Sequence, residues 1–474
     1  MRLLRPDICV IGGGSAGLSV AAGAAQLGAE TVLIEASEMG GDCLNYGCVP
    51  SKALLAAAKA AAQYRSAAEF GVDFSPMHID RKWVQAHIDE VIAAIAPHDS
   101  VARFEGLGVT VLRTWAQFVD ARTVEAGDIR IRARRFVLAT GSSPFIPPIA
   151  GLDQVPYLTN ETIFARIAEI RDLIVLGGGP VGVELAQGFA RLGARVQLVE
   201  MARLLPRDDG DAVDLVRTSL QRDGVSLLEG SAATEVRRAG DRIRLAVGTA
   251  AGETHWVDGA HLLVAVGRRP RVDDMGLDRA GIAATAKGIQ VDAGLRTTNR
   301  RVYAIGDCTG GPAFTHAAGH QAGLVIRSAL FRLPVRFDAP ALPWVTYSDP
   351  ELAQVGLTEQ AARQAGADIV VTHQPFAGND RARAERHDDG FLKIISDRRG
   401  RVLGVTIVGV QAGELLAPWC LAMARNMKLS ALAGTILPYP TLSELGKHAA
   451  GAFYAPRLFS PPIRRLVRIL RWFG

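Results

Sequence analysis

The chain has 474 residues, of which 49% are apolar and 21% charged, and its formal net charge is +5. This length is too great for one hydrophobic core and predicts roughly three domains, while the scattered basic residues give no reason to expect a nucleic-acid partner. Five cysteines are too few for a secreted disulfide scaffold, and we see neither a signal peptide nor an apolar run near ~18 residues, so we expect a cytoplasmic protein.

The first predicted elements form a βαβ unit at the start of the chain. A strand at 7–11 is followed by a glycine-rich turn, an alanine-rich helix and a second strand at 31–34. In such units the first glycine makes the tight turn, the second lets a pyrophosphate approach, and the third lets the helix pack on the strand. An acid after the second strand suits a ribose hydroxyl. The residues in these places are Gly12, Gly14, Gly17 and Glu35.

Two cysteines follow, and they are the most informative pair in the sequence. Cys43 and Cys48 precede an alanine-rich helical pattern that starts at Pro50, and proline is favoured in a first helical turn. Cys48 therefore lies near a helix N-terminus, which favours a thiolate, and such a pair can cycle between dithiol and disulfide. A zinc site usually needs four ligands, and no second cysteine pair exists. Redox chemistry is therefore favoured over a metal site and over two ordinary buried cysteines.

The βαβ pattern occurs a second time. Gly177 lies 165 residues after Gly12, and Glu200 lies 165 residues after Glu35, so the two copies have the same internal spacing. Equal spacing makes coincidence improbable and predicts two dinucleotide sites. The residues of the second copy are Gly177, Gly179, Gly182 and Glu200.

The acid of the second copy bears on the choice of nicotinamide. A carboxylate at Glu200 accepts hydrogen bonds from a free 2′-hydroxyl and repels a 2′-phosphate, which favours NADH over NADPH. Arg203 and Arg207 are close enough in the sequence to keep NADPH as an alternative. Two nucleotide sites and a cysteine pair together indicate electron transfer from a nicotinamide, through a flavin, to a disulfide.

Four segments carry a wider resemblance. Residues 40–52 read GGDCLNYGCVPSK, ATG stands at 139–141, VGRRP at 266–270 and RVYAIGD at 301–307. Over essentially the whole chain, these segments resemble the flavin-dependent pyridine nucleotide-disulfide oxidoreductases, which include glutathione reductase, dihydrolipoamide dehydrogenase and mercuric reductase. The family pattern of the cysteine segment is GGTCxNxGCxPSK, so Asp42 stands where threonine is usual. The resemblance implies that FAD binds at Gly12, Gly14, Gly17, Glu35, Lys52, Thr140, Gly141 and Asp307, and NAD at Gly177, Gly179, Gly182, Glu200 and Gly267.

The same resemblance implies an α/β fold with two Rossmann-like dinucleotide-binding domains and a C-terminal α+β dimerisation domain. Residues 1–150 and 270–335 would bind FAD, residues 151–269 would bind NAD(P), and residues 340–474 would form the dimer interface. A proline-rich stretch at 144–148 fits the first boundary. Active sites in this family are shared across a two-fold homodimer.

Catalytic roles also follow from the resemblance. Cys48 would be the sulfur nearest the flavin, able to form a charge-transfer complex as a thiolate, and Cys43 would be the interchange thiol that meets the substrate. Lys52 would lie beside the N5 edge of the flavin, and Glu184 would pair with it. A cation in that place stabilises the negative charge of the reduced flavin, and the carboxylate holds the lysine.

The C-terminal motif departs from the disulfide reductases. They carry His-Pro-Thr-x-x-Glu, whose histidine protonates the leaving thiolate, whereas Tyr439 stands at that place here and Glu444 ends the motif. A phenol with a pKa near ~10 is a poor base at neutral pH, which argues against ordinary exchange with glutathione or lipoamide.

Mercuric reductases also carry tyrosine at that place. They share the pattern Asp-Cys-Thr-x-x-Pro-x-Phe found at 307–314, and soft thiolates suit a soft metal ion. Those enzymes deliver mercury through a cysteine pair at the extreme C-terminus, whereas the last cysteine here is Cys420. The acceptor therefore stays open among a disulfide, a metal ion and another small molecule, and no resident metal site is predicted.

The last predicted element is a short amphipathic helix within residues 462–474. Four arginines line one side of it. This composition fits a helix that makes peripheral contact with a membrane, and it fits equally a helix docked on the dimer domain of the protein itself. The apolar face is formed by Ile463, Leu466, Val467, Leu470 and Phe473.

These inferences predict a homodimeric FAD enzyme in which NAD(P)H reduces FAD, FAD reduces the Cys43–Cys48 disulfide, and the dithiol reduces an outside acceptor. The alternative is a flavoprotein of low turnover that acts as a redox sensor or as a membrane-associated electron-transfer partner.

Overall fold

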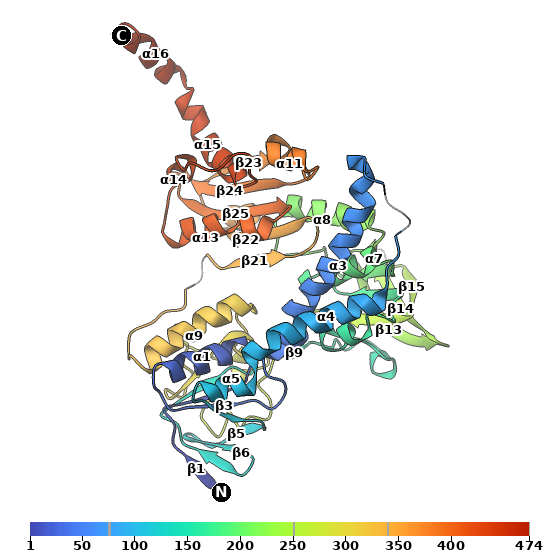
Figure 1. Ribbon diagram of the computed structural model, residues 1–474, viewed down its shortest axis with the longest axis vertical. Helices are drawn as coiled ribbons and strands as arrows, with labels where there is room; N and C mark the ends of the chain where they lie inside the picture. The colour runs from blue at the N-terminus through green and yellow to red at the C-terminus, as the bar shows by residue number, and fades with distance from the viewer. Residues whose placement is uncertain (74–76, 250–251, 339–340, 474) are drawn as a thin grey trace. The chain divides into compact units, whose positions relative to one another are not determined.

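The structure of the chain is a computed structural model that describes every residue except 74–76, 250–251, 339–340 and 474. The described chain divides into two compact units (Figure 1). The large unit comprises residues 1–202 and 226–338, and the small unit comprises residues 203–225 and 341–473.

The large unit contains a five-stranded sheet whose neighbouring strands all run parallel. The two strands of the first βαβ pattern are buried along their whole length, as expected of a parallel sheet covered on both faces. Helices α1 (Ser15–Gln26) and α9 (Thr315–Ala329) pack against each other. The strand order is β20 (Val302–Ala304), β8 (Arg135–Leu138), β2 (Ile8–Ile11), β3 (Thr31–Ile34) and β4 (Thr110–Leu112).

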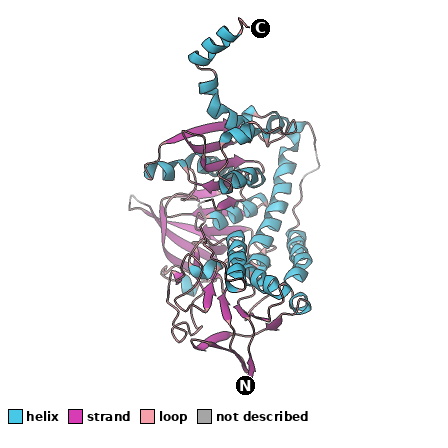
Figure 2. Cartoon of the chain, turned by 90° about the vertical axis from the view of Figure 1, so that its left-hand side faces the viewer, coloured by secondary structure: helices cyan, strands magenta, loops and turns pink. Residues whose placement is uncertain are grey.

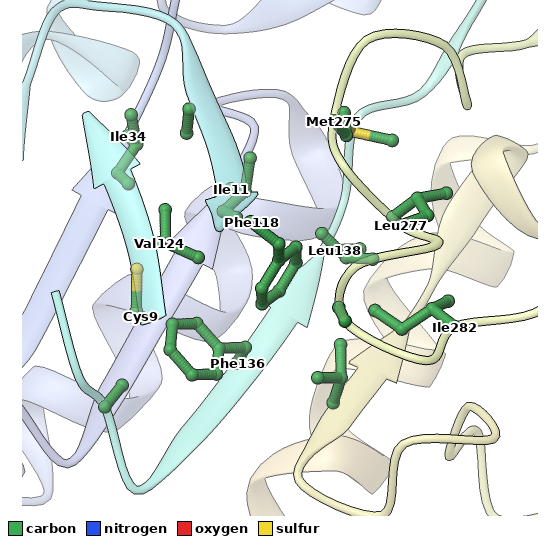
Figure 3. Packing of buried hydrophobic residues seen from close by; sticks show 14 of the residues in the cluster. Cys9, Ile11, Ile34, Phe118, Val124, Phe136, Leu138, Met275, Leu277 and Ile282 are labelled. Atoms are coloured by element: carbon green, nitrogen blue, oxygen red, sulfur yellow. The ribbon is translucent and has the colours of Figure 1, made fainter. Parts of the chain in front are cut away.

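The core beside this sheet joins stretches that are far apart in the sequence. Phe118 and Phe136 meet edge to face, with ring centroids 5.3 Å apart. Met275, Leu277 and Ile282 belong to the same cluster (Figure 3). The chain after residue 270 therefore returns to the core that the first strands build. A smaller sheet nearby has the order β1 (Arg2–Leu4), β7 (Ile129–Ile131), β6 (Thr123–Ala126) and β5 (Ala116–Asp120).

A second parallel sheet lies in the same unit and repeats the βαβ arrangement. Helix α7 (Pro180–Arg191) follows its first strand, and a three-stranded antiparallel sheet is inserted before its last strand. The parallel strands, in order, are β12 (Ser226–Leu228), β11 (Arg195–Val199), β10 (Asp172–Leu176) and β16 (His261–Val264). The inserted strands are β13 (Ser231–Ala239), β14 (Arg242–Thr249) and β15 (Thr254–Gly259).

Helix α3 (Cys48–Ser66) connects the two halves of the large unit. It packs on α4 (Arg81–Ile95) and on α7 (Figure 1). A Cβ atom at Gly188 of α7 would come within 3.4 Å of Leu54 of α3, so the glycine permits a close approach of the two helices. Strands β9 (Ser142–Pro144) and β17 (Arg268–Pro270) also pair with each other, at the two chain segments that lead into and out of the second half.

The small unit is built on an antiparallel sheet of five strands covered by helices. Its core includes the fully buried side chains of Phe376 and Trp419. The strand order is β21 (Pro343–Thr346), β22 (Glu351–Gly356), β25 (Val402–Gly409), β24 (Phe391–Asp397) and β23 (Ile369–Pro375). Its longer helices are α8 (Gly210–Arg222), α13 (Ala417–Ala424), α15 (Glu444–Leu458) and α16 (Pro461–Leu470).

Two parallel dinucleotide-type sheets and a separate antiparallel α+β unit confirm the predicted fold class. The helix expected from Pro50 begins two residues earlier, at Cys48, because Gly47 occupies the N-cap position. Residues 203–225 group with the small unit, although the sequence placed them in the 151–269 domain; the three-domain boundaries stay a prediction. Among the described residues, no helix is both long enough and apolar enough to cross a membrane.

Helix α8 is held in the small unit by a buried lysine. Lys393 of β24 is 5% exposed and donates to both oxygens of Asp209 at 2.9 and 3.0 Å, and to Asp211 at 2.7 Å. Asp209 is equally buried and caps the N-terminus of α8. Burial would lower the pKa of Lys393, but the hydrogen bonds that it donates to Asp211 and Asp209 outweigh burial and raise that pKa.

We therefore expect Lys393→Met to lower the free energy of unfolding by about 3–5 kcal/mol, because the buried Asp209 carboxylate loses its cation. Chemical denaturation of the holoenzyme at one protein concentration measures this change. The matched control is Arg399→Met, since Arg399 is exposed on the same unit and its loss should change stability by less than about 0.5 kcal/mol. Equal stability of the two variants would contradict the role of Lys393.

Candidate functional site

The two glycine turns have nearly the same backbone. The first glycines, Gly12 and Gly177, have φ angles of 111° and 112°, values that L-residues rarely adopt. A Cβ atom on the third glycine would lie 1.8 Å from the Gly12 oxygen in one copy, and 1.9 Å from the Gly177 oxygen in the other. At the second glycine of the later copy, Gly179, a Cβ atom would meet nothing within 4 Å. The turns thus leave backbone open beside a helix N-terminus, where a pyrophosphate binds.

The acids that follow the second strands also match each other. Glu35 accepts from Gly13 N at 2.5 Å and from Ser37 N at 2.6 Å. Glu200 accepts from Gly178 N at 2.6 Å and from Ala202 N at 2.8 Å. Backbone donors therefore fix both carboxylates beside the glycine turns, and an ionised carboxylate has further lone pairs for ribose hydroxyls.

The two cysteines lie on successive helices. Cys43 is on α2 (Gly41–Asn45), and Cys48 is the first residue of α3. Both are free thiols, and they hydrogen-bond to each other. The structure thus brings together the pair that the sequence singled out, and Thr315 Oγ1 lies 3.9 Å from the Cys48 sulfur.

The pKa values of the two thiols shift in opposite directions, and the thiolate role of Cys48 stays a prediction. The hydrogen bond from Cys48, which outweighs burial, lowers the pKa of Cys43 to about 6, with further help from the hydroxyls of Thr315 and Ser15. The same hydrogen bond, together with burial, raises the pKa of Cys48. The hydrogen bond with Cys43 and burial thus raise the pKa of Cys48 and outweigh the charge of the nearby Lys52, which lowers it.

Lys52 and Glu184 form an ion pair of 2.8 Å between α3 and α7. The Glu184 side chain is only 6% exposed, whereas that of Lys52 is 36% exposed. The buried carboxylate holds the lysine one turn after Cys48. Its role beside the flavin stays a prediction.

A polar network that the sequence did not predict surrounds Asp42. Arg268 of β17 lies 3.1 Å from the Asp42 carboxylate and 4.0 Å from that of Asp307. Asn160 donates to Asp42 at 3.0 Å, and Ser142 donates to Asp307 at 2.6 Å. The loop that carries Cys43 is thereby tied to Asp307, a predicted FAD-binding residue. The substitution of aspartate for threonine at position 42 was the one sequence signal that could have suggested a cationic partner.

The remaining predicted flavin and nicotinamide residues lie on the paired segments around β9 and β17. Thr140 Oγ1 donates to the carbonyl oxygen of Arg271 at 2.8 Å, and the Gly141 carbonyl accepts from Arg271 N at 3.0 Å. Gly267 precedes β17 with φ 127°, and a Cβ atom there would meet nothing within 4 Å.

Tyr439 and Glu444 belong to the small unit. The Tyr439 hydroxyl, in a side chain that is 70% exposed, donates to Asp380 at 2.9 Å. This hydrogen bond and the charge of Asp380 raise the pKa of Tyr439, so the phenol keeps its proton at neutral pH. Glu444 begins α15 and accepts from Thr441 N at 3.4 Å. The sequence did not predict Asp380, which lies 59 residues before Tyr439.

Comparison with known proteins decides the family. The sequence model described as pyridine nucleotide-disulphide oxidoreductase matches residues 6–322. The chain belongs to this family. The model of the family's dimerisation domain matches residues 342–450, which supports a homodimer.

Relatives within the family include two kinds of enzyme. The chain is 38% identical to dihydrolipoyl dehydrogenase of Thermus scotoductus, over 94% of this chain and 97% of the relative. It is 33% identical to mercuric reductase of Lysinibacillus sphaericus, over 94% of this chain and 82% of the relative. The solved structure of the HOCl-induced flavoprotein disulfide reductase RclA from Escherichia coli, at 28% identity, aligns over 94% of this chain and 99% of that chain, with a TM-score of 0.84. The Cu(II) complex of RclA aligns with a TM-score of 0.83.

Enzymes of this family use FAD and NAD(P)H, as the sequence predicted. The open glycine turns and the fixed acids of this chain fit two dinucleotides. When bound, FAD supplies the two-electron chemistry between the nicotinamide and the cysteine pair. Among the described residues, no group of three or more histidine, cysteine, aspartate or glutamate side chains could hold a metal ion.

The pKa of Cys43 generates a test by alkylation of the reduced holoenzyme. Because the thiolate is the reactive form, modification of Cys43 by iodoacetamide should rise with pH around a midpoint of about 6. Cys48→Ala removes the donor and should move the midpoint toward the ordinary thiol value near ~8.5. Cys48→Ser keeps a donor and should move it less. Mass spectrometry of the Cys43 peptide gives the midpoint, and an unchanged midpoint in Cys48→Ala would refute the hydrogen-bond cause.

Proposed function

We propose that this FAD-dependent enzyme uses NADH to reduce a thiophilic metal ion through the Cys43–Cys48 pair. The observation that carries the proposal is the protonated phenol of Tyr439, held by Asp380, at the place where disulfide reductases have histidine. A metal ion that leaves after reduction needs no proton on a departing sulfur, so the absence of a base does not hinder it. The mercuric reductase relative and the Cu(II) complex of RclA support this choice.

In this proposal the roles of the cysteines follow from their pKa values. Cys43 is the thiolate at neutral pH and binds the acceptor, because thiolates are the ligands of soft metals. Cys48 is the sulfur on the flavin side, with Lys52 and Glu184 next to it on α3 and α7. NADH supplies two electrons, the disulfide opens to a dithiol, and its closure returns two electrons to one Hg(II) ion or to two Cu(II) ions.

A disulfide substrate is the second candidate, favoured by the 38% identity to a dihydrolipoyl dehydrogenase. Closure of the Cys43–Cys48 disulfide would then deliver two electrons and two protons to the substrate disulfide. Glu444 is present in this chain but the histidine is not, so the second proton has no evident donor. We therefore rank this reaction below metal reduction.

The proposal extends to the assembly of the enzyme and its place in the cell. We propose a cytoplasmic homodimer in which Tyr439 of the partner subunit completes the site around Cys43. We also propose that residues 462–474 make peripheral contact with a membrane.

An acceptor screen tests the proposal. The holoenzyme with NADH should reduce Hg(II) or Cu(II) faster than lipoamide, glutathione disulfide or quinones, and Cys43→Ser should abolish this activity. Tyr439→His should raise the rate with lipoamide by about 10–100-fold, because a general acid typically contributes that much or more, while the rate with metal ions changes little. Rapid lipoamide reduction by the unaltered enzyme would contradict the proposal. Slow reoxidation by oxygen alone would favour the redox-sensor alternative.

The nicotinamide choice has its own matched pair of variants. Glu200→Gln removes the charge that repels a 2′-phosphate, so the ratio of kcat/KM for NADPH to that for NADH should rise by about tenfold or more. Glu35→Gln makes the same change in the other copy and should weaken FAD retention without altering that ratio. Steady-state kinetics and the flavin-to-protein absorbance ratio measure the two effects. An unchanged ratio in Glu200→Gln would exclude Glu200 as the selector.

A further inference from the structure

We propose that the C-terminal helix α16 binds the surface of an anionic lipid bilayer. The inference rests on the membrane contact proposed above, names its lipid chemistry, and does not depend on which acceptor the enzyme reduces. The segment concerned, residues 459–473, is called the tail segment. It extends away from the sheet of the small unit as a continuation beyond α15 (Figures 1 and 2).

The tail segment is not packed on the protein. No residue of α16 is buried, and its apolar side chains are largely exposed, with Leu466 at 48%, Val467 at 51% and Leu470 at 56%. Phe459 and Phe473, which flank the helix, are 61% and 83% exposed. The sequence-based alternative, a helix docked on its own dimer domain, is therefore not what the described chain shows. A contiguous exposed apolar face of this kind marks an interaction surface.

The two faces of the helix are sharply divided. At 100° per residue, the apolar positions occupy one arc and the arginines occupy the opposite arc. Pro461 and Pro462 start the helix, where proline is preorganised for the first turn. The apolar arc contains Ile463, Leu466, Val467, Ile469, Leu470 and Phe473, and the basic arc contains Arg464, Arg465, Arg468 and Arg471.

The charge of the tail segment selects an anionic partner. No aspartate or glutamate follows Glu444 in the sequence, so the segment has no acid of its own to pair with its arginines. In the part of the chain that the structure describes, none of the four arginines of the basic arc forms an ion pair. Each basic residue near an anionic bilayer strengthens binding by about fivefold, because lipid phosphates and carboxylates attract it.

The length of α16 favours binding to a bilayer surface over binding to the α16 helix of a second chain. α16 has ten residues, fewer than the three or more heptads that a coiled coil sustains, and its arginines would repel those of a second helix. Ten residues rise about 15 Å, half of what is needed to cross a bilayer. A helix of this kind lies in the interface plane with its apolar face in the acyl boundary.

The family comparison supports a separate role for the tail segment. The dimerisation-domain model matches only as far as residue 450, so α16 lies outside the matched fold. In a homodimer each enzyme carries two such helices, and binding of the first raises the effective concentration of the second at the same surface. Two short helices can thus hold an enzyme that a single one would hold only weakly.

Co-sedimentation of the holoenzyme with vesicles tests the proposal. We expect binding to phosphatidylcholine vesicles that contain phosphatidylglycerol to be roughly tenfold or more tighter than to phosphatidylcholine alone. Two variants should each lose this binding: Leu466→Gln with Leu470→Gln, and all four arginines of the basic arc changed to glutamine. Glutamine keeps helix propensity close to that of leucine and arginine. The control is Trp83→Gln, because Trp83 is an exposed aromatic residue on α4, with a side chain that is 73% exposed. This variant should bind vesicles like the unaltered enzyme.

The outcomes separate this proposal from the proposed function. NADH oxidation with soluble acceptors should be the same in all these variants as in the unaltered enzyme. If the unaltered enzyme binds vesicles but does not reduce the metal ions, the acceptor proposal alone is overturned. Vesicle binding equal to that of a chain ending at residue 460 overturns the lipid proposal. Tail-dependent self-association on size exclusion without lipid also overturns it and assigns the apolar face to a second copy.

Discussion

The ion pair between Lys52 and Glu184 is the constraint on which the inner site depends. Lys52 comes from the helix that begins with Cys48, and Glu184 comes from the helix that follows the second glycine turn. A carboxylate that is 6% exposed is costly without a cation, and the pair can form because Gly188 lets the two helices approach closely. One contact therefore sets the cysteine-bearing helix against the second dinucleotide half of the large unit.

A second set of charges ties the cysteine loop to the predicted flavin aspartate. Asp42 adds a negative charge beside Cys43, and Arg268 neutralises it while also lying near Asp307. Without that cation, the Asp42 carboxylate would disfavour a thiolate on its neighbour. An arginine from the strand that leaves the second half thus links the carboxylate beside Cys43 to that of Asp307.

The sequence predicts those site residues whose positions are fixed by contacts within their own βαβ unit. The glycine turns, Glu35 and Glu200 follow from spacing because turn, helix and acid are local to each other. Arg268, Asn160 and Asp380 do not, since each acts on a residue far away in the sequence. Sequence reasoning likewise missed Thr315 and Ser15, whose hydroxyls add to the effect of Cys48 in lowering the pKa of Cys43, because they come from other elements. The place of residues 203–225 depends likewise on a distant residue, Lys393.

In the proposed function, the acceptor side and the flavin side of the cysteine pair meet different chemical requirements. On the flavin side, the Lys52–Glu184 ion pair and the fixed carboxylates of Glu35 and Glu200 match what a flavin and a nicotinamide require. In the proposed function, Tyr439 lies on the acceptor side, where its hydroxyl, which donates to Asp380 and has a raised pKa, can donate a hydrogen bond but is a poor base. The proposed chemistry therefore proceeds by ligation to sulfur and electron transfer, which needs no base to cycle a proton. In that proposal a low thiol pKa is the main requirement for capturing an acceptor, and the hydrogen bond from Cys48 lowers the pKa of Cys43 accordingly.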